Sequence, residues 1–175
     1  PFKKWVLGIS DIARQYEQRV DQFSELPMST ERKYLEGQVV LVGYGRVGKR
    51  IAKALSDSNI PYVVAEENRE IVESLRKKGI PAVSGNASEP AVLIQAHIAN
   101  ASMLVIATPD TINIRKMAET AKTLRPEIQI VIRTHNESES NLLNAESIGK
   151  VFYGEEELAN GMSQFIVEQF TPRQV

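Results

Sequence analysis

Residues 38–66 hold the sequence feature that most restricts the fold of this chain. A short apolar run ending at Val42 is followed directly by Gly43–Gly48, whose sequence GYGRVG matches the motif G-x-G-x-x-G. The apolar spacing after this motif predicts a helix over 46–57, and a second strand-like run ends at Glu66. This order of strand, glycine motif, helix, strand and acid is typical of a nucleotide-binding βαβ unit.

Several positions in this unit have a physical role in holding a phosphate and a ribose. Gly43 lets the chain turn sharply, Gly45 has no Cβ to keep a phosphate away, and Gly48 lets the helix pack closely. The helix that starts near Arg46 directs unpaired N–H groups and its positive dipole end at the phosphate. Glu66 can accept hydrogen bonds from both ribose hydroxyls and disfavours NADP, whose 2′-phosphate would face a like charge. The alternative is a Rossmann-like domain without a ligand.

Composition restricts the class of protein further. The 175 residues, 42% hydrophobic and 25% charged, suit one substantial α/β domain. A net charge of -1 does not indicate a nucleic-acid partner. The absence of cysteine excludes thiol chemistry and disulfides, and two distant histidines give little support for a metal site. No run is long enough to span a membrane, but the chain begins with Pro1, so we expect it to be part of a larger protein.

Strand and helix patterns alternate from residue 38 onward. The predicted strands are 38–42, 61–65, 81–84, 103–107, 128–132 and 149–152, and the predicted helices are 46–57, 68–78, 88–96, 110–124, 137–147 and 155–169. The runs 103–107 and 128–132 are almost continuously apolar, as in strands that are covered on both faces. We therefore predict an α/β fold, a Rossmann-like doubly wound parallel sheet of six strands in the order 3-2-1-4-5-6.

The two ends of the chain depart from this alternation. Residues 1–36 are predicted to be a linker from an upstream, membrane domain, with a helix capped by Ser10 that runs to about Leu26. Residues 37–169 are predicted to form the nucleotide-binding domain, and 170–175 are predicted to form a tail. The last helix has an apolar stripe that predicts contact with another chain or, alternatively, packing on its own sheet. Its members are Leu158, Met162, Phe165, Ile166, Val167 and Phe170.

Ligands of such a sheet bind beyond the carboxyl ends of its strands. The candidate binding residues at these ends are Gly43, Tyr44, Gly45, Arg46, Val47, Gly48, Glu66, Glu67, Asn86, Ala87, Thr108, Pro109, Asp110 and Arg133. Asn86 can contact an adenine edge, or it can serve as a turn residue or helix N-cap. Asp110 can line the site or cap the helix 110–124. Arg46 and Arg133 can each hold a phosphate or a carboxylate. The alternative for Arg46 is a solvated residue in the first helical turn, and the alternative for Arg133 is a structural ion pair.

Several of these features together resemble the RCK or KTN nucleotide-binding domain, also called TrkA-N. They are the glycine motif, Glu66, the turn Gly85–Ala87, the corner Thr108–Asn113 and Arg133. The resemblance covers about residues 37–169 and is closest to the cytoplasmic C-terminal domain of Kef-type monovalent cation/proton antiporters. The stretches Leu75–Gly79 and Asn113–Arg133 are most like that branch.

The resemblance implies a regulatory domain of an integral membrane protein, at the cytoplasmic face of the bacterial inner membrane. It implies that the nucleotide is AMP, NAD(H) or ATP, and that its state controls potassium/proton antiport. It also implies a homodimer, which we expect to form through the C-terminal helix. By the family pattern, phosphate lies at Gly43, Gly45, Arg46 and Gly48, ribose at Glu66 and adenine at Asn86, while Asp110 and Arg133 line the rest. Many members have Asp at the position of Asn86, so this chain departs from the pattern at the adenine contact.

Two other functions compete with this interpretation. A small NAD-dependent oxidoreductase would need a region that holds the substrate and supplies a proton, and only 155–175 follow the sixth strand. No Tyr-x-x-x-Lys pair is present, so we do not expect an enzyme. A soluble potassium-uptake subunit of Trk type is the second competitor, and the sequence preceding Pro1 would distinguish it.

Overall fold

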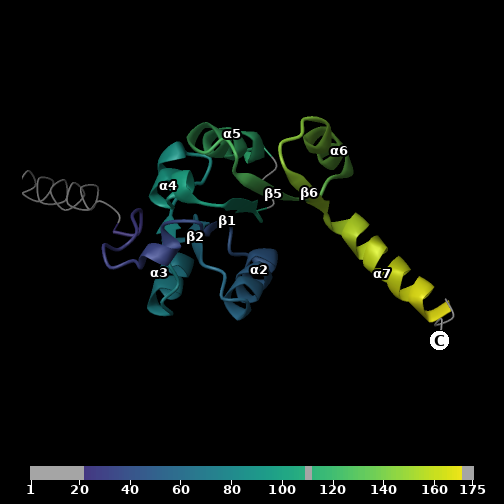
Figure 1. Cartoon of the computed structure of the whole chain (residues 1–175), viewed down its shortest axis with the longest axis horizontal. Helices are drawn as coiled ribbons and strands as arrows, with labels where there is room; N and C mark the ends of the chain where they lie inside the picture. Colours follow the sequence, from purple (N-terminus) through teal and green to yellow (C-terminus); the bar gives the residue numbers. More distant parts are fainter. Residues whose placement is uncertain (1–21, 109–111, 171–175) are drawn as a thin grey trace, which may run out of the picture.

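The computed structural model describes residues 22–108 and 112–170, which form one parallel sheet with helices on both faces (Figure 1). The six strands have the order β3-β2-β1-β4-β5-β6, and every neighbouring pair is parallel. The strands are β1 (Val39–Val42), β2 (Tyr62–Glu66), β3 (Ala82–Ser84), β4 (Met103–Ile106), β5 (Gln129–Thr134) and β6 (Lys150–Tyr153). The predicted fold class and strand order are confirmed.

The helices cover the two faces of the sheet in separate groups. They are α2 (Arg46–Asp57), α3 (Arg69–Lys77), α4 (Pro90–Gln95), α5 (Ile114–Leu124), α6 (Glu137–Ala145) and α7 (Gly154–Phe170), with short 3-10 helices at Arg32–Tyr34 and Ile98–Asn100. Helices α2 and α3 lie on one face, and α4, α5 and α6 lie on the other (Figure 1). Val40 and Leu41 of the central strand belong to the two apolar clusters on opposite faces of the sheet. Both are fully buried, because helices cover each face.

Two helices begin later than the sequence predicts. Helix α5 starts at Ile114, not at residue 110, and Asn113 occupies its N-cap position. Ile114 is fully buried whereas Ile112 is exposed, so the helix begins where its apolar side chains reach the core. The interpretation of Asp110 as the N-cap is therefore wrong, and Asp110 itself lies outside the described residues. Helix α4 starts at Pro90, not at residue 88, because proline is favoured in the first turn of a helix.

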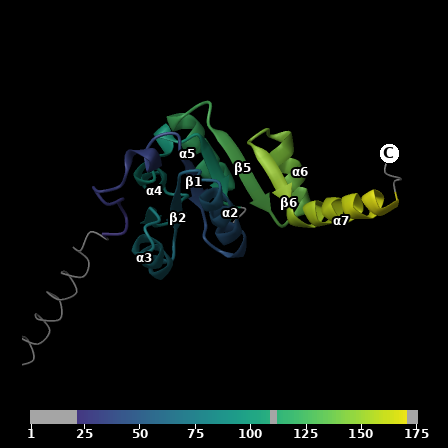
Figure 2. The ribbon, with the colours of Figure 1, turned by 60° about the horizontal axis from the view of Figure 1, so that its bottom comes forward.

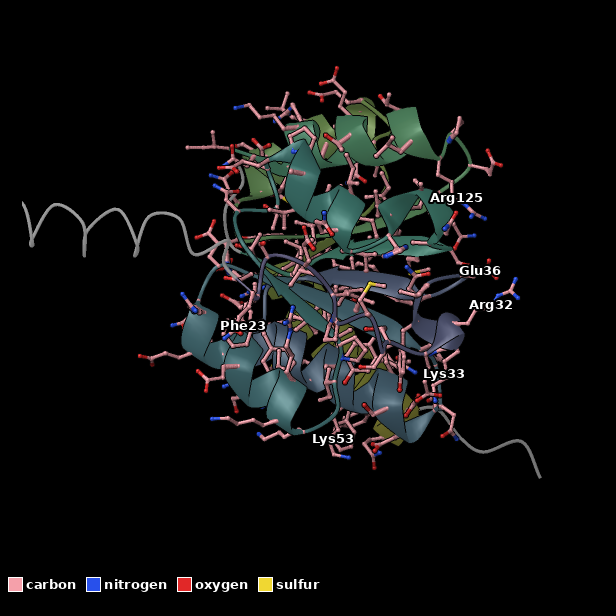
Figure 3. All side chains as sticks on the ribbon, turned by 90° about the vertical axis from the view of Figure 1, so that its left-hand side faces the viewer. Phe23, Arg32, Lys33, Glu36, Lys53 and Arg125 are labelled. Carbon is pink, nitrogen blue, oxygen red and sulfur yellow. The ribbon has the colours of Figure 1, made fainter. Side chains whose placement is uncertain are left out.

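The predicted N-terminal helix does not extend to Leu26. Residues 22–25 form turns and bends, residue 26 is not helical, and the rest of the predicted helix lies outside the described residues. The physical reason is that backbone carbonyls in this segment accept hydrogen bonds from Arg76 and Ser84 instead of from a following helical turn. Figure 3 shows Phe23, in the middle of this segment, beside α3.

Helix α7 extends away from the sheet beyond β6 (Figures 1 and 2). The six residues of its apolar stripe are between 53% and 84% exposed, so the alternative that the helix packs on its own sheet is wrong. At its first turn the Tyr153 hydroxyl donates to the Glu155 carboxylate over 2.7 Å, and this hydrogen bond raises the pKa of Tyr153 to about 12. Within residues 22–108 and 112–170, no helix is long and apolar enough to cross a membrane.

Candidate functional site

A cavity of about 90 Å³ lies at the carboxyl edge of the sheet. The loops after β1, β2, β3 and β4 enclose it, at the place where the chain's strand order reverses between β1 and β4. In open α/β sheets this switch point is the usual position of a ligand. The lining residues are Val42, Gly43, Ala65, Glu66, Glu67, Gly85, Asn86, Ala87, Thr108, Asn113 and Met117.

The three glycines of the motif have different surroundings. Gly43 has φ +89°, a conformation that other residues rarely adopt, and a Cβ on Gly48 would lie 2.1 Å from the Gly43 carbonyl oxygen. A Cβ on Gly45, in contrast, would meet none of the described atoms within 4 Å. The fold itself therefore requires glycine at 43 and 48, whereas the space at Gly45 is open to a ligand.

The Glu66 carboxylate joins the loops that follow β1 and β2. Its Oε2 accepts a hydrogen bond from the Tyr44 N–H over 2.7 Å, and its Oε1 accepts one from the Asn68 N–H over 2.9 Å. Both donors are backbone groups, so the carboxylate has a defined position at the edge of the cavity. Glu66 therefore holds the glycine loop and also lines the cavity.

The Tyr44 side chain packs against the apolar cluster on the α2–α3 face of the sheet. Burial raises the pKa of its phenol above the ordinary value, and the charge of Tyr62 acts in the same direction. The Lys49 ammonium lies 5.9 Å from the ring centroid, within the range of a cation–π contact. Tyr44 is not among the cavity-lining residues, and its backbone N–H contributes to the site by holding Glu66.

Asn86 forms the turn that follows β3. Its Oδ1 accepts a hydrogen bond from the Ser88 N–H over 2.8 Å, which confirms the turn interpretation. The N-cap position of α4 is Glu89, so the N-cap interpretation of Asn86 is wrong. Asn86 and Ala87 also line the cavity, and this position is compatible with an adenine contact. The adenine contact itself stays a prediction.

Arg133 lies beside the cavity rather than in its wall. Its guanidinium donates to the Ala107 carbonyl over 3.2 Å, one residue before Thr108 of the cavity. Arg133 and Val47 line a separate apolar groove on the α2 side of the sheet. Arg46 and Val47 occupy the first turn of α2. Whether these residues contact a ligand stays a prediction, and Pro109 and Asp110 lie outside the described residues.

Five residues that line the cavity are not among the candidate binding residues: Val42, Ala65, Gly85, Asn113 and Met117. The apolar spacing of α5 predicts that Met117 is buried, and it is 2% exposed. That spacing contains no signal that the buried face of the helix also borders a cavity. Among the described residues, no cluster of three or more His, Asp or Glu side chains could hold a metal ion.

Comparison with known proteins extends this description. The TrkA-N domain family matches residues 39–154 of the chain. A relative from Escherichia coli K12, YbaL, described as a cation/proton antiporter, is 30% identical over 150 residues, which are 86% of this chain and 26% of YbaL. The glutathione-regulated potassium-efflux system protein KefC of Salmonella typhi is 30% identical over 99 residues, which are 57% of this chain and 16% of KefC. The chain thus spans about a quarter of the length of YbaL and less of KefC.

Solved structures share the fold. The crystal structure of the TrkA-N domain of the Escherichia coli inner membrane protein YbaL is 33% identical with a TM-score of 0.69, covering 74% of this chain and 96% of that one. The Kef CTD of Shewanella denitrificans in an AMP-bound form is 18% identical with a TM-score of 0.64, covering 78% and 83%. The GsuK channel bound to NAD is 21% identical with a TM-score of 0.60, covering 80% and 25%.

Proposed function

Because this chain belongs to the TrkA-N domain family, we propose that it is a regulatory domain that binds an adenosine nucleotide and controls a membrane transporter. The observation that carries this proposal is the position of Glu66. Its carboxylate is held by the glycine loop and lines the cavity at the switch point, while the space at Gly45 is open. A carboxylate for the ribose and an open glycine for the phosphate are the two groups that a nucleotide requires here.

The proposed ligand is AMP or NAD(H), with ATP as a further candidate. The Kef CTD was solved with AMP and the GsuK channel with NAD, and both share the fold of this chain. We propose that the phosphate lies over the loop Gly43–Gly48, the ribose at Glu66 and the adenine at Asn86. The remaining contacts are assigned to Tyr44, Arg46, Val47, Glu67, Ala87, Thr108, Pro109, Asp110 and Arg133.

Replacing Glu66 with alanine is expected to weaken the binding of AMP and NAD by about ten- to a hundredfold. The physical reason is the loss of a charge-assisted hydrogen bond to the ribose, which contributes about 1.5–3 kcal/mol. The variant also loses the two hydrogen bonds that hold the Tyr44 and Asn68 N–H groups. Titration calorimetry with each nucleotide measures the effect, and mass spectrometry of what copurifies with the chain identifies the natural ligand.

Glu70→Ala is the matched control for that experiment. Glu70 is an exposed carboxylate in the first turn of α3, near Glu66 in sequence but not among the cavity-lining residues. We expect its removal to leave nucleotide affinity within about twofold, the range of ordinary surface substitutions. If Glu66→Ala binds as tightly as Glu70→Ala, the ribose is held elsewhere.

The proposed transporter is a monovalent cation/proton antiporter, of which this chain forms the part at the cytoplasmic face of the bacterial inner membrane. YbaL, whose name describes a cation/proton antiporter, and KefC, whose name describes a potassium-efflux system protein, support this assignment over a soluble Trk-type subunit. A nucleotide can control ion flux only if it binds one conformation of the protein more tightly than another. The domain would therefore change conformation according to which nucleotide is bound, and it would not convert the nucleotide chemically.

The proposed oligomer is a homodimer formed through α7. The helix presents an exposed apolar stripe, and the same chain has an open groove of about 470 Å³ over β4, β5 and β6. Its wall is mostly aliphatic, including Ile51, Leu55 and Val105, and Gly154 at the start of α7 borders it. We propose that α7 of each copy covers apolar surface of the other, because burying both surfaces removes them from water.

An NAD-dependent oxidoreductase is the competing function. Membership of the TrkA-N family favours regulation without catalysis. We expect no oxidation of NADH when the chain is incubated with a panel of simple carbonyl compounds, followed by the absorbance of NADH. Turnover of any of these compounds, above a control without protein, would favour the oxidoreductase instead.

A further inference from the structure

The segment 22–26 lies against the edge of the sheet at β3, the strand whose following loop forms part of the candidate nucleotide cavity. The Phe23 carbonyl accepts a hydrogen bond from the Ser84 N–H over 2.6 Å. The Phe23 ring lies 5.0 Å from the guanidinium carbons of both Arg69 and Arg76, which project from α3. Figure 3 shows Phe23 beside this helix. The segment is therefore attached to the sheet edge through its backbone and through its aromatic ring.

Arg76 supplies most of the attachment. Its Nε donates to the Ala82 carbonyl over 2.8 Å, and its terminal nitrogens donate to the carbonyls of Gln22 and Phe23 over 2.9 and 3.1 Å. A terminal nitrogen also donates to the Glu25 carbonyl. One guanidinium thus joins three carbonyls of the segment to the start of β3. A lysine cannot reproduce this arrangement, because an ammonium lacks the planar, five-donor geometry.

The attachment point adjoins the cavity directly. Ser84, whose N–H binds the segment, is the parallel partner of Glu66 in the sheet. The next residue, Gly85, donates its N–H to the Glu66 carbonyl over 3.1 Å, and Gly85 and Asn86 line the cavity. A nucleotide in the cavity and the segment at the sheet edge would therefore contact the same short stretch of chain from opposite sides.

We propose that Arg76 couples nucleotide binding to the docking of segment 22–26 on the sheet edge. A nucleotide that orders the loop Ser84–Ala87 reduces the conformational entropy that docking of the segment must still remove, so each event strengthens the other. Linkage requires the two effects to be equal in size. The nucleotide rests on the function proposed above, whereas the docking role of Arg76 does not.

Hydrogen exchange of backbone amides, followed by mass spectrometry with AMP as the probe, tests both parts. Without nucleotide, Arg76→Lys is expected to speed exchange at Ser84 about tenfold, the effect of losing one hydrogen bond, while β1 exchanges as in the wild type. AMP is expected to slow exchange at Ser84 and at 22–26 in the wild type. The dissociation constant for AMP is expected to rise at least about fivefold in Arg76→Lys.

Two further variants make the test specific. Phe23→Ala weakens the same contact from the segment side and leaves Arg76 in place, so it should also raise the AMP dissociation constant. Its effect should be much smaller in the Arg76→Lys background, because the two residues act on one contact. Lys77→Ala removes a neighbouring exposed cation that pairs with Glu73 on α3, and it should change neither measurement.

Each outcome decides one part of the proposal. Unchanged exchange at Ser84 in Arg76→Lys overturns the docking role. Faster exchange with an unchanged AMP affinity overturns the coupling. If calorimetry shows that AMP, NAD and ATP do not bind the wild type, the proposed function and the coupling both fail, while Ser84 exchange still decides the docking role.

Discussion

Replacing Gly48 with alanine is expected to lower the melting temperature of this domain by about 10 °C. The new Cβ would lie 2.1 Å from the Gly43 carbonyl oxygen and 3.0 Å from its carbonyl carbon. Both are backbone atoms that cannot rotate away, so α2 or the glycine loop must shift. We estimate a loss of about 3 kcal/mol for such overpacking, and in a domain of this size each kcal/mol corresponds to about 2–4 °C. Thermal unfolding followed by circular dichroism, without nucleotide, measures the effect.

Gly45→Ala is the matched control, because it adds the same methyl group three residues earlier in the same glycine motif, at the N-cap position of α2. A Cβ at Gly45 meets none of the described atoms within 4 Å, and its φ of -76° suits alanine. The melting temperature should therefore stay unchanged or rise slightly. Affinity for AMP should nevertheless fall at least about tenfold, since the methyl occupies the approach of the phosphate.

The two variants separate the structural from the ligand-binding role of glycine. An unchanged melting temperature in Gly48→Ala would contradict the close packing of α2 on the loop. An unchanged AMP affinity in Gly45→Ala would show that no phosphate approaches the backbone there. A loss of both properties in both variants would mean that the loop acts as a single structural unit.

The change Phe165→Glu is expected to convert a dimer into a monomer. Phe165 lies in the apolar stripe of α7 and is 63% exposed in the single chain. If a second copy covers this stripe, the variant buries a carboxylate among apolar side chains. A central aromatic residue of an interface commonly contributes 2 kcal/mol or more, so we expect the dimer dissociation constant to rise at least about thirtyfold. Sedimentation equilibrium at tens of micromolar, with and without nucleotide, measures the change.

Asn160→Glu controls for the added negative charge. Asn160 is exposed on the same helix but outside the apolar stripe, so its replacement should leave the dimer intact. A wild-type chain that is monomeric at every concentration tested, with and without nucleotide, would overturn the proposed dimer. A dimer that both variants leave unchanged would place the interface on another surface.

Local sequence patterns were sufficient to predict much of the fold. The apolar runs predicted all six strands within one or two residues at each end, because strands buried on both faces must be apolar along their length. The strand order followed from right-handed crossovers between parallel strands. Helix starts were less accurate: α5 begins at Ile114 because burial of that side chain, rather than a capping residue, determines its first turn.

The candidate site was predicted in part, for a physical reason. Gly43, Glu66 and Thr108 lie at or just after the carboxyl ends of β1, β2 and β4, and parallel strands bring these ends to one edge of the sheet. Met117 and Asn113 reach the cavity from α5, which packs across the sheet, so their contribution depends on helix packing. Arg133 was predicted on the same ground, because it lies near the carboxyl end of β5. Its hydrogen bond to the Ala107 carbonyl, however, places it beside the cavity.

The sequence by itself determined the parallel sheet, the strand order and the glycine loop with its acid, because these depend on local periodicity and on short-range backbone constraints. The tertiary structure alone decided that Arg76 holds the segment 22–26, that Arg133 turns toward Ala107 and that α7 leaves its apolar stripe exposed. These features depend on how segments far apart in the chain pack, or on which side chains that packing leaves exposed. No local pattern of residue types specifies such packing.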